Sequence, residues 1–145
     1  MKFVNVSLCG ITFHIPNEWL FFPSDKFILA KHDAQVGLLK IALAENGRHD
    51  ASEEEMLAQA SSFLSRQKLT SPFDTVHHEN GTSKYGAASY RIQENKRDFL
   101  ARLMYLIRGE NVLLAAYGCD WANKDTPAVR EELRQCELMI RSAKF

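Results

Sequence analysis

The sequence has no run of apolar residues approaching the roughly 18–20 that a membrane-spanning helix needs. It has no excess of charge either, because 18 Lys and Arg side chains are balanced by 18 Asp and Glu side chains. Dedicated nucleic-acid binders usually carry a basic stripe, and polybasic segments hold proteins to membranes, so neutrality argues against both partners. The chain also begins without the apolar region of a signal peptide, so we expect a cytoplasmic protein.

Cysteines are few and far apart in the sequence: Cys9, Cys119 and Cys136. An odd, widely spaced set favours neither a disulfide framework nor a zinc site, so we expect reduced thiols. His77 and His78 are adjacent, and adjacent strand residues point to opposite faces, so they do not share a metal unless the strand bulges. There is no HExxH pattern and no glycine-rich phosphate loop. We therefore expect no metal, no cofactor and no enzymatic activity.

Residues 85–119 are predicted to form three consecutive antiparallel strands, at 85–93, 99–108 and 111–119, with a polar loop at 94–98 and a tight turn at 109–110. The middle strand is apolar on both of its alternating sets, which only Arg102 and Arg108 interrupt. A strand with one solvated face alternates cleanly between apolar and polar residues. We therefore expect these strands to lie mid-sheet with both faces covered.

Two further hairpins are predicted upstream, one pairing 2–8 with 11–15 and one pairing 26–31 with 36–43, and residues 73–79 are predicted to form a further strand. The segment between them, 19–23, is the densest aromatic cluster in the chain. We interpret it mainly as core that closes one end of the fold; the alternative is that some of its rings stay exposed as an interaction patch. Gly37 and Gly118 lie within or beside predicted strands, where glycine marks a bulge or close packing.

Two amphipathic helices are predicted. Ser52 and Glu55 form a capping box at the start of the first helix, and Asp125 or Thr126 caps the second, with Pro127 in its first turn. The apolar stripe of the first helix is expected to comprise Met56, Leu57, Ala60, Phe63 and Leu64. The buried stripe of the second helix is expected to comprise Val129, Leu133, Cys136, Ile140 and Ala143. Helices separated by blocks of strands favour an antiparallel α+β fold. We expect a single domain over residues 1–145, a three-layer α/β/α sandwich with one helix on each face of the sheet.

This order of elements, together with Phe-His-Ile-Pro-Asn-Glu-Trp at residues 13–19, resembles the PsbP/Mog-like superfamily. That group contains the PsbP extrinsic photosystem subunit, Mog-type Ran-binding proteins, DcrB-like proteins and effector-associated chaperones of type VI secretion. Its early strand is commonly followed by a Pro-x-x-Trp turn, often Pro-x-Gly-Trp. Pro16 and Trp19 match this pattern, and Glu18 stands where Gly is common. The resemblance implies a binding or assembly protein without catalytic residues.

The leading hypothesis is a non-catalytic protein-binding module, an adaptor or chaperone-like protein whose partner is another protein or a second copy of itself. Its candidate partner-binding residues are Trp19, Leu20, Phe21, Phe22 and Arg102.

Two alternatives stay open. One is a small-ligand or enzymatic domain with a pocket between sheet and helix that uses His14, His77 or Cys119. The other is a module for single-stranded nucleic acid, in which basic residues of the sheet work beside aromatic rings. That module would use Arg91, Arg102 and Arg108 with Tyr90 and Tyr105.

Overall fold

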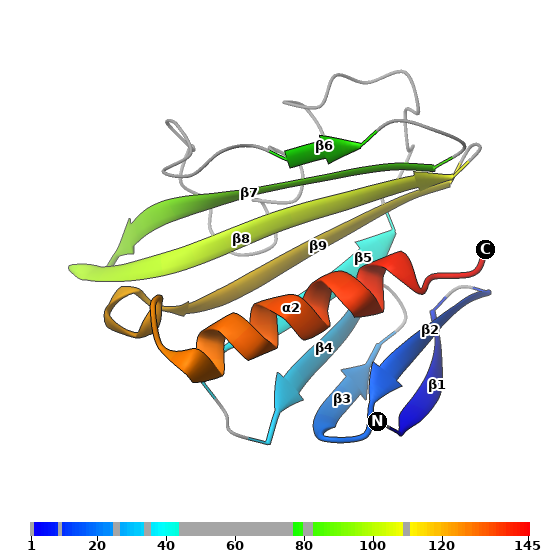
Figure 1. The fold of residues 1–145 in the computed structure, drawn as a ribbon, viewed down its shortest axis with the longest axis horizontal. Helices are drawn as coiled ribbons and strands as arrows, with labels where there is room; N and C mark the ends of the chain where they lie inside the picture. Colours follow the sequence, from blue (N-terminus) through cyan, green and yellow to red (C-terminus); the bar gives the residue numbers. More distant parts are fainter. Residues whose placement is uncertain are drawn as a thin grey trace.

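The computed structural model describes residues 2–8, 10–24, 27–33, 36–43, 77–79, 83–108 and 111–145. Within this part of the chain, β1 (Phe3–Leu8) and β2 (Ile11–Pro16) form a two-stranded sheet. A seven-stranded antiparallel sheet has the order β3-β4-β5-β9-β8-β7-β6. Its strands are β3 (Trp19–Pro23), β4 (Phe27–His32), β5 (Leu38–Leu43), β6 (His77–Glu79), β7 (Ser83–Glu94), β8 (Arg97–Arg108) and β9 (Asn111–Asp120). The short η1 (Trp121–Asn123) leads into α2 (Pro127–Arg141), which crosses one face of this sheet (Figure 1).

The predicted N-terminal hairpin is confirmed. Its turn contains Gly10 at φ +87°, a backbone conformation that glycine adopts without steric cost. The backbone of Thr12 also exchanges two hydrogen bonds with Lys144, at 2.9 and 2.8 Å, so the C-terminal residues extend the hairpin. These bonds hold the small sheet against the C-terminal end of α2 (Figure 1).

The three predicted strands at 85–119 are confirmed as β7, β8 and β9, but the polar loop expected at 94–98 is wrong in length. The connection is a two-residue turn at Asn95 and Lys96, whose φ values are +50° and +64°. Positive φ at both central residues matches the right-handed twist of the strands they join. Glu94 and Arg97 therefore pair across the ladder rather than lying in a loop.

The aromatic segment at 19–23 is itself a strand, β3, which sequence reasoning missed. It pairs with β4 from Trp19 opposite His32 to Pro23 opposite Ile28. It is therefore the edge strand next to the predicted hairpin of β4 and β5, which is also confirmed. Of the predicted strand at 73–79, the structure describes residues 77–79, which form β6.

The predicted C-terminal helix is confirmed with its cap. The Thr126 hydroxyl accepts the backbone N–H of Val129, and Pro127 occupies the first helical turn. Four of the five predicted stripe residues are buried, Leu133 being half-buried, but Glu132 and Gln135 are buried as well. The helix predicted from Ser52 lies outside the described residues.

Buried residues form two groups, one on each face of the sheet. The face under α2, called here the helix face, shares a core with the N-terminal hairpin. On the opposite face, called here the distal face, ten residues of β7, β8 and β9 are buried: Ala88, Tyr90, Ile92, Ala101, Leu103, Tyr105, Ile107, Val112, Leu114 and Ala116. The expectation that the middle strands are buried on both faces is confirmed, and the fold class is antiparallel α+β.

Candidate partner-binding surface

Alternate residues of β3 point to opposite faces of the sheet. Trp19 is 3% exposed, and its indole N–H donates to Gln135 Oε1 on α2 at 2.6 Å. Its ring also meets His32 edge-on, with centroids 5.5 Å apart. Phe21 is half-buried against the same core. Trp19 and Phe21, expected as partner-binding residues, are therefore held in the core of the helix face.

Leu20 and Phe22 occupy the other face of β3 and are 56% and 57% exposed. Phe22 lies opposite the half-buried Leu29 of β4, and Leu38 at the start of β5 is 36% exposed. We call Leu20, Phe22, Leu29 and Leu38 the distal apolar surface. Isolated exposed apolar residues are ordinary, whereas a contiguous group on adjacent strands usually marks an interaction site.

Two lysines interrupt this surface. Lys31 is the cross-strand partner of Leu20, and Lys40 is the partner of Leu29. The Lys40 ammonium lies 4.6 Å from the centroid of the Phe27 ring, where a cation interacts favourably with the ring face. Both lysines are half-buried, so their aliphatic stems add apolar area to the surface.

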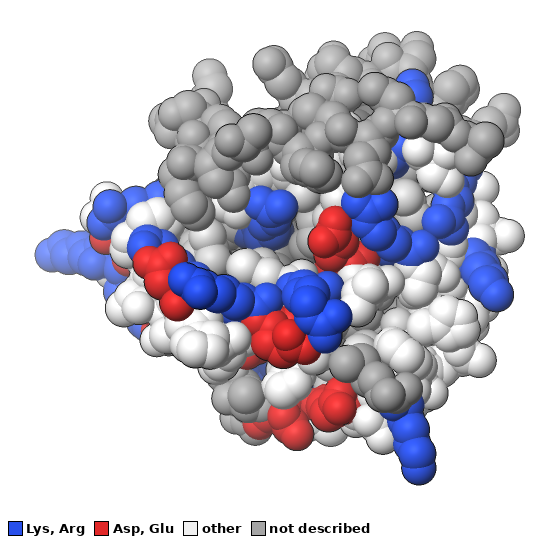
Figure 2. Space-filling model, viewed as in Figure 1, with Lys and Arg blue, Asp and Glu red and all other residues white. Residues whose placement is uncertain are grey.

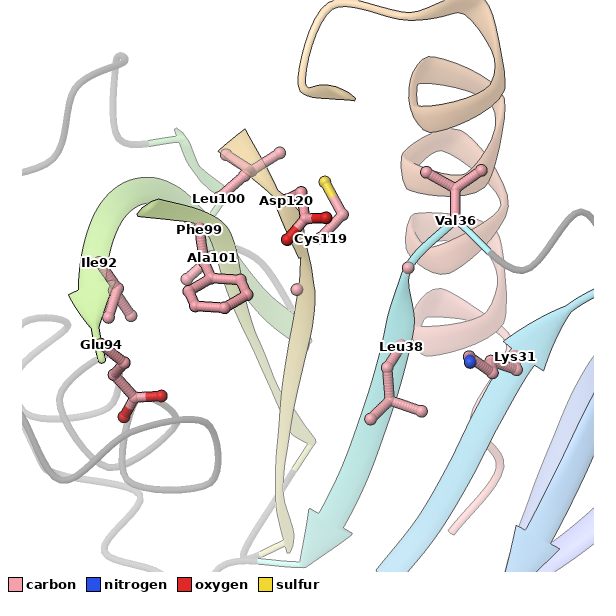
Figure 3. A pocket seen from close by; sticks show the side chains of 12 residues that line it. Lys31, Val36, Leu38, Ile92, Glu94, Phe99, Leu100, Ala101, Cys119 and Asp120 are labelled. Atoms are coloured by element: carbon pink, nitrogen blue, oxygen red, sulfur yellow. The ribbon is translucent and has the colours of Figure 1, made fainter. Parts of the chain in front are cut away.

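A cavity of about 320 Å³ adjoins the distal apolar surface (Figure 3). Its floor is low because Leu38 pairs with Gly118 and Gly118 pairs with Ala101, which leaves two small residues side by side. Leu38 stands on one side of this floor, with Ile92 and Phe99 on the other. The charged residues of the lining are Lys31, Glu94 and Asp120. The cavity therefore has apolar walls and a few polar groups, as binding pockets usually do.

Cys119 also lines this cavity, but its surroundings suppress its reactivity. Burial, with a smaller contribution from the Glu132 carboxylate, raises the pKa of the Cys119 thiol to about 11. The thiolate is the nucleophilic form of cysteine, so this thiol is poorly reactive at neutral pH. Of the three residues offered for the ligand-pocket alternative, Cys119 lines this cavity, whereas His14 lies in the two-stranded sheet and His77 lies on β6, which β8 and β7 separate from β9.

A buried acid, which sequence reasoning did not identify, supports the cavity wall from the helix face. Glu132 is 1% exposed, and its Oε1 accepts hydrogen bonds from the Gly37 backbone N–H at 3.1 Å and the Tyr117 hydroxyl at 3.2 Å. Its other oxygen has no hydrogen-bond partner in the described part of the chain. A Cβ at Gly37 would lie 2.3 Å from the Tyr117 ring, so the expectation of close packing at this glycine is confirmed.

Arg102, the fifth predicted partner-binding residue, lies on the helix face of β8. Its guanidinium donates to Ser89 Oγ at 2.9 Å, and its side chain lines a cavity beside α2. It therefore lies on the opposite side of the sheet from Leu20 and Phe22. The predicted set of partner-binding residues does not form one contiguous site.

The basic and aromatic residues of the nucleic-acid alternative are also divided between the two faces. Arg91 donates to Asp98 Oδ2 at 2.5 Å and stacks over Trp121 of the helix-face core, while Arg108 bonds to the carbonyls of Ala143 and Arg141. By contrast, Tyr90 and Tyr105 are buried in the distal core. A single surface of stacking rings and cations is therefore not formed by these residues.

The described residues contain no group of three or more His, Cys, Asp or Glu side chains arranged to hold a metal ion. Nor is any helix among them both long and apolar enough to cross a membrane.

No family model matches the chain, and no curated protein matches its sequence. Solved structures do match its fold. A protein of Bacteroides thetaiotaomicron aligns over 99% of this chain, with a TM-score of 0.64 and 14% identity. This chain spans 48% of the length of that protein. The cyanobacterial PsbP (CyanoP) from Synechocystis aligns over 99% of this chain and 92% of its own, with a TM-score of 0.58 and 13% identity. The predicted fold is therefore confirmed as PsbP-like, and identities of 13% and 14% show the fold alone.

Proposed function

We propose that this protein is a non-catalytic protein-binding module, an adaptor or chaperone whose partner docks on the distal apolar surface. One observation carries the proposal: Leu20 and Phe22, two residues apart on an edge strand, are each more than half exposed on the same face. The alternate residues, Trp19 and Phe21, pack in the core of the opposite face. Exposing two large apolar side chains contributes nothing to folding. Their burial by a partner would recover that apolar contribution.

The shape and charge of the surface indicate the chemistry of the partner. An apolar segment laid across β3, β4 and β5 would cover Leu20, Phe22 and Leu29. One of its large side chains would enter the neighbouring cavity of about 320 Å³ beyond Leu38. Lys31 lines this cavity and lies opposite Leu20, so an acidic residue beside the inserted side chain would complete the contact. Buried anchors of this kind usually supply most of the binding energy of an interface.

The test compares changes of exposed apolar residues to Ser on two different surfaces. In Leu20→Ser/Phe22→Ser both exposed side chains of β3 become polar, while the control, Leu138→Ser, changes a residue of α2 that is 43% exposed. Proteins retained by the tagged wild-type chain are identified and quantified, and the same partner is then measured with each variant. We expect Leu20→Ser/Phe22→Ser to lose at least tenfold of this partner and Leu138→Ser to keep it, with thermal unfolding unchanged in both.

Equal retention of the partner by all three proteins would refute the proposal. Sedimentation of the purified wild-type chain tests whether the partner is a second copy of the chain. If it sediments as a dimer and Leu20→Ser/Phe22→Ser sediments as a monomer, a second copy of the chain covers the surface, and the proposal of a different partner is wrong.

We also propose the three-layer arrangement predicted from sequence, with the amphipathic helix that begins at Ser52 covering the distal face over β7, β8 and β9. The ten buried residues there support it, because α2 lies on the other face. Phe63 lies on the predicted apolar stripe of that helix, so Phe63→Ala should lower the free energy of unfolding by about 3–5 kcal/mol. A loss below about 0.5 kcal/mol in urea unfolding would contradict the arrangement.

The cytoplasmic location stays a prediction, for cell fractionation to test.

A further inference from the structure

β1 is an edge strand, and its outer side has no neighbouring strand in the part of the chain that the structure describes. Figure 1 shows β1 at the margin of the molecule, with β2 between it and the C-terminal end of α2. Unpaired backbone groups along such an edge can pair with another chain, so most proteins protect their edge strands with Lys, Pro or a β-bulge.

The sequence of β1 contains none of these protections. The strand reads Phe-Val-Asn-Val-Ser-Leu, with no charged residue and no proline, and its register with β2 is uninterrupted. Figure 2, drawn from the same side as Figure 1, shows mainly uncharged side chains in this corner of the molecule. Nothing in the strand therefore repels a second strand.

The hydrogen bonds of the hairpin show which backbone groups of β1 face outward. Asn17 N–H donates to the Lys2 carbonyl at 3.0 Å, so every second cross-strand pair from this one onward is hydrogen-bonded. The residues between those pairs turn their N–H and C=O groups away from β2. We call them the outward residues of β1: Phe3, Asn5 and Ser7.

β2 confirms this alternation, because its own outward groups have partners. Thr12 exchanges two backbone hydrogen bonds with Lys144, and His14 N–H donates to Ser142 Oγ at 3.0 Å. The backbone groups of the outward residues of β1 have no such partner among the described residues, and all three residues are exposed. An open row of N–H donors and C=O acceptors therefore lies along β1.

We propose that β1 pairs antiparallel with β1 of a second copy of the chain, so that the two hairpins join into one four-stranded sheet. The register that pairs all three outward residues places the two-fold axis at Asn5, which then faces Asn5 of the other copy. Phe3 faces Ser7 of the other copy, and each pair of outward residues exchanges two backbone hydrogen bonds. Because the outward residues are symmetric about Asn5, the edge is complementary to itself.

The same register continues the apolar side of the hairpin. Val4 is 40% exposed, and it comes opposite Val6 of the other copy, a residue whose side chain is buried in the core. Sheets of three or more strands are also more stable than an isolated two-stranded sheet. One pair of six-residue strands buries less than the roughly 1,600 Å² of a standard interface, so we expect association in the micromolar range. This dimer does not use the distal apolar surface, which belongs to the other sheet.

Sedimentation velocity of the purified full chain, from about 1 to 200 μM, measures this self-association. We expect a reversible monomer–dimer equilibrium in the wild type. Asn5→Pro removes an N–H that donates to no described residue, so the fold should be kept, as thermal unfolding checks. Its affinity for a second copy should fall at least about tenfold, because the central pair loses both hydrogen bonds. The matched control, Asn5→Ala, keeps the N–H and should stay within about threefold of the wild type.

Opposite charges at position 5 test the register and do not depend on how the proline variant folds. Asn5→Lys and Asn5→Asp each place like charges face to face across the axis, so each variant alone should dimerise more weakly than the wild type. A mixture of the two should associate at least about fivefold more tightly than either alone. Ser7→Lys places a charge opposite Phe3 instead, so it should weaken the dimer less than Asn5→Lys does.

A wild-type chain that stays monomeric throughout this concentration range would overturn the proposal. Dimerisation of Asn5→Pro as tight as that of the wild type would also overturn it, as would a charged mixture that associates no more tightly than its components. A wild-type dimer that Leu20→Ser/Phe22→Ser abolishes would instead place the second copy on the distal apolar surface, and pairing through β1 would be wrong.

Discussion

The alternation within β3 makes a sharp prediction about stability. Trp19→Ala removes a side chain that is 3% exposed, and truncating a buried aromatic residue costs about 3–5 kcal/mol. It also leaves the Gln135 carbonyl oxygen, bonded at 2.6 Å in the wild type, without that donor, which adds about 1–3 kcal/mol for a buried polar group. We therefore expect a total loss of at least about 4 kcal/mol, a large part of the 5–15 kcal/mol typical of a domain.

Leu20→Ser changes the adjacent residue, which is 56% exposed, and should alter the unfolding free energy by no more than about 0.5 kcal/mol. Urea unfolding followed by far-ultraviolet circular dichroism measures both variants without depending on the fluorescence of Trp19. With a slope of about 2 kcal/mol per molar urea, Trp19→Ala should lower the midpoint by about 2 M, and Leu20→Ser should leave it almost unchanged.

A double-mutant cycle isolates the hydrogen bond between Trp19 and Gln135. Trp19→Phe keeps an aromatic ring but removes the indole N–H, so its cost should shrink when Gln135 is already Leu. If Leu20→Ser destabilised the protein as much as Trp19→Ala, both faces of β3 would be buried. The reasoning behind the distal apolar surface would then be refuted.

Three further predictions concern the framework of the site. Gly37→Ala should cost about 1–3 kcal/mol in urea unfolding, because the new methyl group overlaps the Tyr117 ring, and Gly37→Ala should cost much less when Tyr117 is Leu. Stability should fall as the pH rises from about 9 towards 11: burial raises the pKa of Cys119 to about 11 and that of Cys136 well above its usual value, so the unfolded chain releases these protons first. Urea midpoints across this pH range should fall less steeply in Cys119→Ala/Cys136→Ala. Thr126→Ala should cost about 1 kcal/mol by thermal unfolding, because it removes the N-cap of α2, and Thr126→Ser should restore most of it.

The elements with strong local signals were predictable. Thr126 and Pro127 mark the start of α2 through the chemistry of helix capping, which depends on neighbours in sequence alone. The two-sided apolar pattern of β8 likewise predicts burial on both faces, as the two core groups confirm. By contrast, the turn residues Asn95 and Lys96 include no glycine, the usual sequence signal of a two-residue hairpin turn. The polar residues around them therefore favoured a longer loop than the turn that forms.

The site depends on contacts that are distant in sequence, which is why its composition was only partly predictable. Trp19 and Phe21 are as apolar as Leu20 and Phe22, and only the pairing of β3 with β4 decides which pair meets the core. Glu132 is a second case. Its burial follows from its position opposite Tyr117 and the Gly37 backbone, and nothing in the local helix pattern distinguishes it from a solvated acid.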